Sequence, residues 1–170
     1  VPCDTLVIAA GQMPAWHLPC QAGARLTFDA ATGGFGFDLA DPTITLAGVL
    51  AGAGDAPPAL PPLDAHDKGM DFVDLDEDLQ IMDIRNAVKE GYRDLELVKR
   101  ISTVGMGPSQ GRHWALPTAR LVAEQTGRTL GQIGVTTARP PTSPETLGAL
   151  AGPHHRAERR TALHHVHRAH

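Results

Sequence analysis

Residues 81–112 read IMDIRNAVKEGYRDLELVKRISTVGMGPSQGR, and the spacing of the apolar residues in this stretch decides the fold class. The pattern predicts one helix from Ile81, ended by Gly91, and a second helix with Asp94 as its N-cap. Two short helices of this kind can bury their apolar faces only against each other or against a further element. The residues expected to be buried are Ile81, Ile84, Ala87, Val88, Leu95, Val98 and Ile101.

Downstream of this stretch the helical pattern continues. We expect a third helix over 109–125, with Leu121 and Val122 inward and Ser109 at its start. Thr129 and Gln132 have the spacing of a capping box, which predicts one further helical turn. Residues 71–138 therefore form a small helical domain.

Upstream, the residues predict strands instead. The run DTLVIAAG at 4–11 is typical of a buried parallel strand, 25–28 and 35–39 of two strands around a turn, and 44–55 of a further strand that ends in Gly-Asp. Prolines at 56–62 exclude a regular helix or a central strand there. The predicted fold class is α+β: the C-terminal remnant of a dinucleotide-binding α/β domain, followed by the helical domain.

A buried parallel strand needs neighbouring strands and covering helices, and the residues before 4–11 supply neither. We therefore expect the chain to be an internal piece of a larger protein, or a subunit that completes the sheet of another chain. The first residue, Val1, agrees with this expectation.

Composition narrows the class of protein. The 170 residues contain no apolar run long enough to span a membrane, and the start lacks the features of a secretion signal, so we expect a cytoplasmic protein without a membrane partner. The two cysteines, Cys3 and Cys20, have no metal-ligand spacing.

Charge is distributed unevenly along the chain. Residues 1–63 carry five acids and one base, 64–100 eleven acids and six bases, and 101–170 three acids and eight bases. The arginines of the last segment are not interleaved with aromatic residues that could stack on bases. We therefore expect an anionic cofactor or a partner surface rather than nucleic acid.

The strand that ends in Gly-Asp indicates a nucleotide site. A carboxylate at this place can accept two hydrogen bonds from ribose or ribityl hydroxyls. The residues expected there are Gly11, Gly54 and Asp55. The alternative for each is an ordinary turn at the end of a strand.

The loop GMGPSQGR at 105–112 has three interpretations: a phosphate-binding loop, the remains of a metal site, or a plain turn between helices. Its glycines allow close backbone approach and Arg112 adds a fixed positive charge. The candidate cofactor-binding residues are Gly105, Gly107, Ser109, Gln110, Gly111 and Arg112.

Five stretches resemble, in order and spacing, the middle of the alpha subunit of heterotetrameric sarcosine oxidase. The chain is similar also to the alpha subunits of dye-linked proline dehydrogenase and opine oxidases. The stretches are DTLVIAAGQMPAWHLPCQAG at 4–23, AGVLAGAGD at 47–55, the whole of 71–112, GVTTARPPTSPETLGALAG at 134–152 and RRTALHHVHRAH at 159–170.

The resemblance implies that the helical domain is a ferredoxin-like module of the type that binds a 2Fe-2S cluster in some relatives. The cluster cysteines of those relatives fall here on Asp74, Asp76, Val104 and Ser109. A cluster needs thiolates, or occasionally histidines, so we expect none in this chain. The implied domains are 1–55, a partial dinucleotide-binding domain; 56–70, a linker; 71–138, the helical module without cluster; and 139–170, an extended arm.

The resemblance also implies a function. In the family, a flavin in the beta subunit oxidises an N-methyl amino acid and the one-carbon unit passes to tetrahydrofolate. FMN lies at the interface between alpha and beta subunits, where we expect the loop 105–112 to face it. NAD or FAD is expected only with an upstream half, and the arm is expected to lead, as a polar linker strand, towards a folate-binding domain of the family that is absent from this sequence.

No residue is expected to act as acid, base, nucleophile or metal ligand, the histidines of the tail included. Two alternatives stay open: a non-catalytic docking module of an amino-acid or opine dehydrogenase complex, and an electron-transfer module. The second would require iron.

Overall fold

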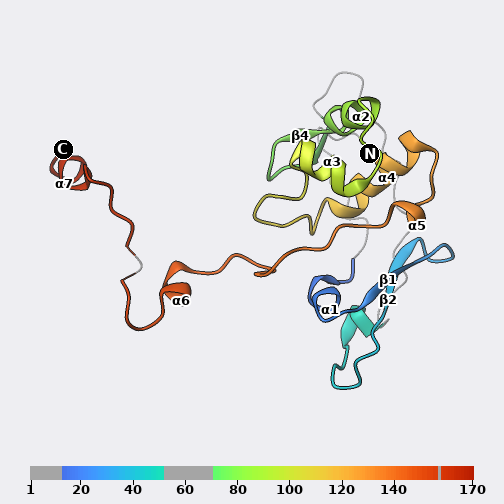
Figure 1. The fold of residues 1–170 in the computed structure, drawn as a ribbon, viewed down its shortest axis with the longest axis horizontal. Coiled ribbons are helices and arrows are strands. Elements are labelled where there is room, and N and C mark those ends of the chain that lie inside the picture. Colours follow the sequence, from blue (N-terminus) through green and yellow to red (C-terminus); the bar gives the residue numbers. More distant parts are fainter. Residues whose placement is uncertain (1–12, 52–70, 157) are drawn as a thin grey trace, which may run out of the picture.

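The computed structural model describes residues 13–51, 71–156 and 158–170, and these combine helices and strands (Figure 1). The predicted strand at 4–11, the candidate residues Gly11, Gly54 and Asp55, and the predicted linker at 56–70 lie outside the described residues. In Figure 1, helices α2, α3 and α4 form one group, and α1 lies beside the hairpin of β1 and β2 below it.

Residues 13–51, the first described part, contain a helix and a hairpin that are joined by a cluster of aromatic side chains. Strands β1 (Arg25–Asp29) and β2 (Gly34–Asp38) pair antiparallel with Phe28 opposite Phe35, which confirms the two predicted strands. The preceding helix α1 (His17–Gln21) begins after Trp16, and this indole is 2% exposed. Its ring centroid lies 6.2 Å from that of Phe35. Aromatic contacts therefore give this hairpin a small core of its own.

The prediction of a strand at 44–55 is wrong for residues 44–51, which are the described part of this range. Residues 44–51 contain no strand, and a 3-10 helix, η1 (Gly48–Ala51), occupies their end. Ile44 is 37% exposed and Val49 is 38% exposed. No described strand lies beside this run to bury its apolar side chains, and Gly48 has a positive φ, so the run does not form a strand.

The helical part begins with a short antiparallel hairpin, β3 (Phe72–Asp74) and β4 (Leu79–Gln80), which leads directly into α2 (Ile81–Lys89). Helix α3 (Leu95–Ser102) follows with the predicted Asp94 cap, whose carboxylate accepts a hydrogen bond from the Glu96 amide at 3.0 Å. Both helices start where a side chain satisfies amides that the helix leaves unpaired.

Helix α4 (Ala115–Thr126) packs on α2, and α5 (Leu130–Ile133) closes the group with the predicted capping box of Thr129 and Gln132. The predicted inward residues are buried with one exception, since Ile101 is 49% exposed. The core consists of Val73, Ile81, Ile84, Ala87, Val88, Leu95, Val98, Val104, Ala119, Leu121 and Val122.

The start of the third helix differs from the prediction. Helix α4 begins at Ala115 after Trp114, which caps it without a side-chain hydrogen bond, and Ser109 lies six residues upstream of the first helical residue. The Gln110 amide donates to the Gly107 carbonyl and the Arg112 amide to the Ser109 carbonyl. These turns delay the helix, so Ser109 is a loop residue and not a cap.

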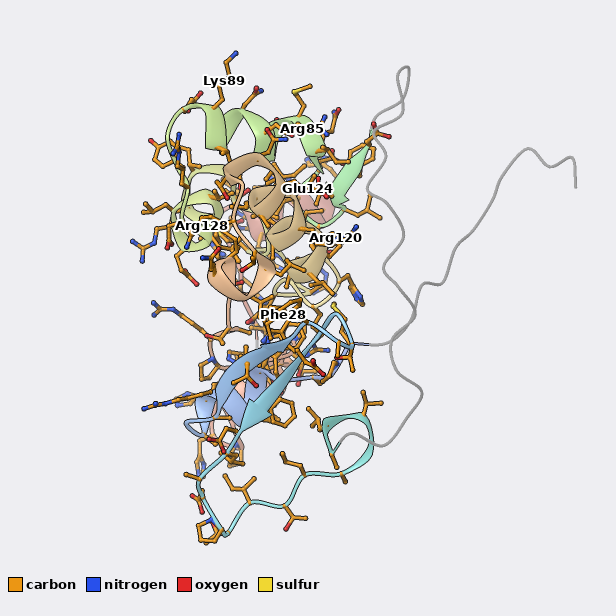
Figure 2. All side chains as sticks on the ribbon, turned by 90° about the vertical axis from the view of Figure 1, so that its right-hand side faces the viewer. Phe28, Arg85, Lys89, Arg120, Glu124 and Arg128 are labelled. Carbon is orange, nitrogen blue, oxygen red and sulfur yellow. The ribbon has the colours of Figure 1, made fainter. Side chains whose placement is uncertain are left out.

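The first described part contacts the helical part at helix α5. Helix α5 lies on β1, and a Cβ added to Gly131 would stand 3.4 Å from the Cβ of Phe28. Figure 2 shows Phe28 where the hairpin meets the helical part. Glycine at this position lets the helix approach the ring closely.

The arm after residue 138 carries two short helices, α6 (Leu147–Ala151) and α7 (His164–Ala169). Thr146 caps α6, and its side chain accepts a hydrogen bond from the Ala149 amide. Helix α7 lies in the segment predicted as a polar linker strand, so that prediction is wrong. Neither helix buries a residue, and the arm extends away from the rest of the described chain (Figure 1).

Among the described residues, no helix has the length and apolar character to cross a membrane.

Candidate functional site

The loop between α3 and α4 is held by two carboxylates from the β3–β4 hairpin. Asp74 is fully buried, and its Oδ2 accepts a hydrogen bond from the Gly105 amide at 2.7 Å. Its other oxygen accepts from the amides of Asp76 at 2.9 Å and Glu77 at 3.3 Å. A buried carboxylate is expensive unless its lone pairs are occupied, and three amide donors occupy these.

Asp76 holds the far end of the same loop. Its Oδ2 accepts a hydrogen bond from the Ser109 amide at 2.9 Å. The Ser109 hydroxyl is buried beside this carboxylate and makes no hydrogen bond of good geometry with the described residues. The nearby hydroxyl is nevertheless the largest cause of the lowered pKa of Asp76. The Ser109 amide is the second cause. Two carboxylates, two residues apart, thus fix both ends of a five-residue span of loop.

The glycines of the loop serve these contacts. A Cβ on Gly107 would stand 2.3 Å from the Cβ of Asp76, which is closer than real side chains approach. Gly105 and Gly111 both have positive φ, and a Cβ on Gly105 would stand 3.3 Å from the Cα of Gly111. The loop is therefore folded tightly on itself and on Asp76.

This folding determines which amides remain for a ligand. The amides of Gly105, Met106, Ser109, Gln110 and Arg112 all donate to acceptors within the chain. A phosphate cradle made only of backbone amides, as the glycine pattern alone would indicate, has few donors left here. Side chains would have to supply the contacts to an anion.

Two side chains of the loop reach the arm instead of solvent. Gln110 Nε2 donates to the Pro141 carbonyl at 2.6 Å, and Arg112 Nη2 donates to the Thr142 carbonyl. Arg112 is exposed, and no described carboxylate pairs with its guanidinium. Its positive charge therefore stays uncompensated at the surface while one nitrogen fixes the arm.

Helix α1 binds Ala138, the residue directly before the arm. Gln21 Nε2 donates to the Ala138 carbonyl at 2.9 Å, and the Ala138 amide donates to Nδ1 of His17 at 3.1 Å. His17 is 4% exposed. Burial lowers the pKa of its imidazole, and the charges of Arg112 and Lys99 lower it further. The accepting Nδ1 requires the neutral ring.

A small pocket lies next to the loop, between α3 and the start of α4. It is lined by Leu95, Lys99, Val104, Gly105, Gly111, Trp114, Ala115, Thr118 and Thr136. Trp114 Nε1 is a buried donor without an acceptor. No described carboxylate pairs with Lys99. The sequence analysis did not identify Lys99 or Trp114 as site residues, because only the fold brings them beside the loop.

The four positions that correspond to cluster ligands do come together. Asp74 accepts a hydrogen bond from the amide of Gly105, the residue directly after Val104. Asp76 accepts one from the amide of Ser109, which is itself the fourth position. Valine has no ligand atom, and both carboxylates already accept amide hydrogen bonds, so this donor set does not fit an iron–sulfur cluster. The described residues also contain no cluster of three or more histidine, cysteine or acidic side chains suited to a metal ion.

Residues 68–153 match the family model of the sarcosine oxidase A3 domain, which is about half of the chain and contains the whole loop and both carboxylates. The chain belongs to the family of sarcosine oxidase alpha subunits. It is 28% identical to the alpha chain of sarcosine oxidase from Rhizobium meliloti strain 1021, over 89% of this chain and 19% of the relative. The segment thus spans about one fifth of that relative.

Two further comparisons agree with this family. The chain is 35% identical to one of the subunits of opine oxidase from Rhizobium meliloti strain 1021, over 44% of this chain and 16% of the relative. The structure is similar to that of L-proline dehydrogenase from P. horikoshii, with a TM-score of 0.64, 22% identity, and coverage of 84% of this chain and 38% of the other. The similarity to L-proline dehydrogenase is a similarity of fold.

Proposed function

We propose that this chain is the segment of a sarcosine-oxidase-type alpha subunit that forms one side of an FMN site at the interface with a beta-type flavin subunit. The observation that carries the proposal is the loop 105–112, which two carboxylates hold in place while Arg112 and Lys99 beside it have no described ion-pair partner. An uncompensated pair of cations, Arg112 on the fixed loop and Lys99 on helix α3, suits the phosphate of a flavin mononucleotide.

The complete complex would be a cytoplasmic heterotetramer that oxidatively demethylates an N-methyl amino acid and passes the one-carbon unit to tetrahydrofolate. The flavin would supply the redox chemistry. This chain would supply position and charge, through Gly105, Gly107, Ser109, Gln110, Gly111 and Arg112, and none of its residues would act as acid, base or nucleophile. We propose that it holds no iron–sulfur cluster.

The dinucleotide role of Gly11, Gly54 and Asp55 stays a proposal that depends on an upstream domain for the bulk of an NAD or FAD site. The proposed domains are 1–55, 56–70, 71–138 and 139–170, as in the sequence analysis. The contacts of His17 and Gln21 with Ala138 support a role for the first segment in fixing the arm.

The test is the FMN content of the assembled complex after Arg112→Glu. Charge reversal should weaken FMN retention by about tenfold or more, because a charge-assisted contact becomes a repulsion. Arg112 also holds the arm, so Gln21→Ala is the matched control: it removes a hydrogen bond to the arm without changing charge. Arg93→Glu, an exposed reversal at the start of α3, controls for net charge. An unchanged flavin content in Arg112→Glu would contradict the proposal.

The second candidate is a docking module that binds a flavoprotein partner without a cofactor of its own. The exposed leucines of α6 favour it, since Leu147 is 65% exposed and Leu150 is 70% exposed. A complex that forms normally after both leucines are changed to serine would exclude α6 as the docking surface.

A further inference from the structure

We propose that the pocket between α3 and α4 is a phosphate subsite in which the Lys99 ammonium and the Trp114 indole N–H hold one anionic oxygen. This inference deepens the proposed FMN role. It rests on that role only for the claim that the bound phosphate belongs to FMN. It assigns the contacts to two side chains outside the loop 105–112, whose own amides largely donate within the chain.

Two donors of the residues that line this pocket have no acceptor among the described residues. The first is Trp114 Nε1, which is buried and makes no hydrogen bond within the described part of the chain. A buried donor left unpaired costs free energy, so an oxygen that reaches it is favoured. Lys99, which also lines the pocket, has three donors and no described carboxylate partner. The lining itself contains no acidic residue, and the carboxylate of Asp74, which contacts the lining residue Gly105, already accepts hydrogen bonds from three amides.

The charge around the pocket is positive. Lys99 lines it, and Arg112 follows the lining residue Gly111. Burial lowers the pKa of His17, and the charges of both cations lower it further. Apolar walls from Leu95, Val104 and Ala115 limit screening by water. One cation and one unpaired indole N–H in the lining, with Arg112 next to the lining residue Gly111, match an anionic phosphate oxygen better than a neutral ligand.

The size of the pocket limits what enters it. The space open to the centre of a water-sized molecule is about 10 Å³, which is close to the room that one water needs. One phosphate oxygen fits there, and the rest of the ligand has to remain at the mouth. The pocket therefore fits an oxygen of a terminal phosphate whose carrier lies outside the pocket.

The experiment follows the indole N–H signals of Trp16 and Trp114 by NMR while inorganic phosphate is titrated into the 170-residue chain at constant ionic strength. The Trp114 signal should shift and saturate, while the buried Trp16 signal stays in place as an internal control. FMN should produce the same shift, and riboflavin, which lacks the phosphate, should not.

Lys99→Gln should weaken phosphate binding by about tenfold or more, because it removes the charge that the indole N–H cannot replace. Lys89→Gln is the matched control, because Lys89 is exposed at the end of α2 and does not line the pocket. It should bind phosphate like the unaltered chain.

The outcomes separate the two proposals. Absence of a Trp114 shift with phosphate, or equal binding by Lys99→Gln, overturns the phosphate subsite even if the complex retains FMN through Arg112. A Lys99-dependent phosphate shift combined with normal flavin content in Arg112→Glu and Lys99→Gln complexes supports the subsite and overturns the FMN role.

Discussion

The amide of Gly105 donates to Oδ2 of Asp74 at 2.7 Å across a separation of 31 residues, and this hydrogen bond joins the β3–β4 hairpin to the loop before α4. Because Asp74 is fully buried, the contact is shielded from water. The hairpin therefore determines where the loop lies, and the loop determines where Arg112 lies.

We predict that Asp74→Asn destabilises the chain. One amide oxygen can replace one carboxylate oxygen, but the NH₂ group cannot accept the second set of amide hydrogen bonds. The expected loss is about 1.5–3 kcal/mol of the free energy of unfolding, measured by urea denaturation. Glu124→Gln, on the exposed face of α4 in Figure 2, removes the same charge and should change stability little. Equal stability of the two variants would mean that the Asp74 contacts do not hold the loop.

Gly107→Ala should also destabilise the chain, because the new Cβ would stand 2.3 Å from the Cβ of Asp76 and one of them has to move. Overpacking of this kind typically costs about 1–3 kcal/mol. In the background of Asp76→Gly, which removes the opposing Cβ, the same alanine should cost less. Gly148→Ala in α6, with no atom within 4 Å of the added Cβ, is the control. Strict additivity of the two changes at 107 and 76 would argue against the close approach.

The contact of His17 with Ala138 predicts a dependence on pH. Burial, Arg112 and Lys99 lower the pKa of folded His17 below its usual value of 6.5. The neutral ring is thus favoured by folding, so its stabilising effect is present above about pH 6.5 and declines as the pH falls below that value.

The measurement is the urea midpoint at about pH 7.5 and about pH 5.5. The unaltered chain should lose stability at the lower pH, and His17→Gln should lose less. His113→Gln, at an exposed histidine, should behave like the unaltered chain. If His17→Gln and the unaltered chain respond equally to pH, the His17–Ala138 hydrogen bond does not contribute as described.

Much of the helical part could be predicted because its signals are local. The Asp94 cap, the Thr129–Gln132 capping box and the spacing of Ile81, Ile84 and Val88 act within one or two turns. The hairpin of Phe28 and Phe35 was predictable for the same reason, from β-forming residues on both sides of a glycine turn.

The loop and the site could not be predicted in this way, because contacts distant in sequence form them. Ser109 has the residue type of a helix cap, yet Asp76 binds its amide and the helix begins only at Ala115. Asp74 appeared in the sequence only as an aspartate at a lost cluster position. Lys99 and Trp114 have no motif, and they become candidates only when the fold brings them to one pocket.

The most direct test of the proposed role is hydrogen exchange in the assembled alpha–beta complex, with FMN and after its removal. FMN should slow amide exchange across 103–114 and leave the exchange of helix α2, at 81–89, unchanged. The same exchange rates in 103–114 with and without FMN, in a complex that binds the flavin, would contradict the claim that this loop faces the cofactor.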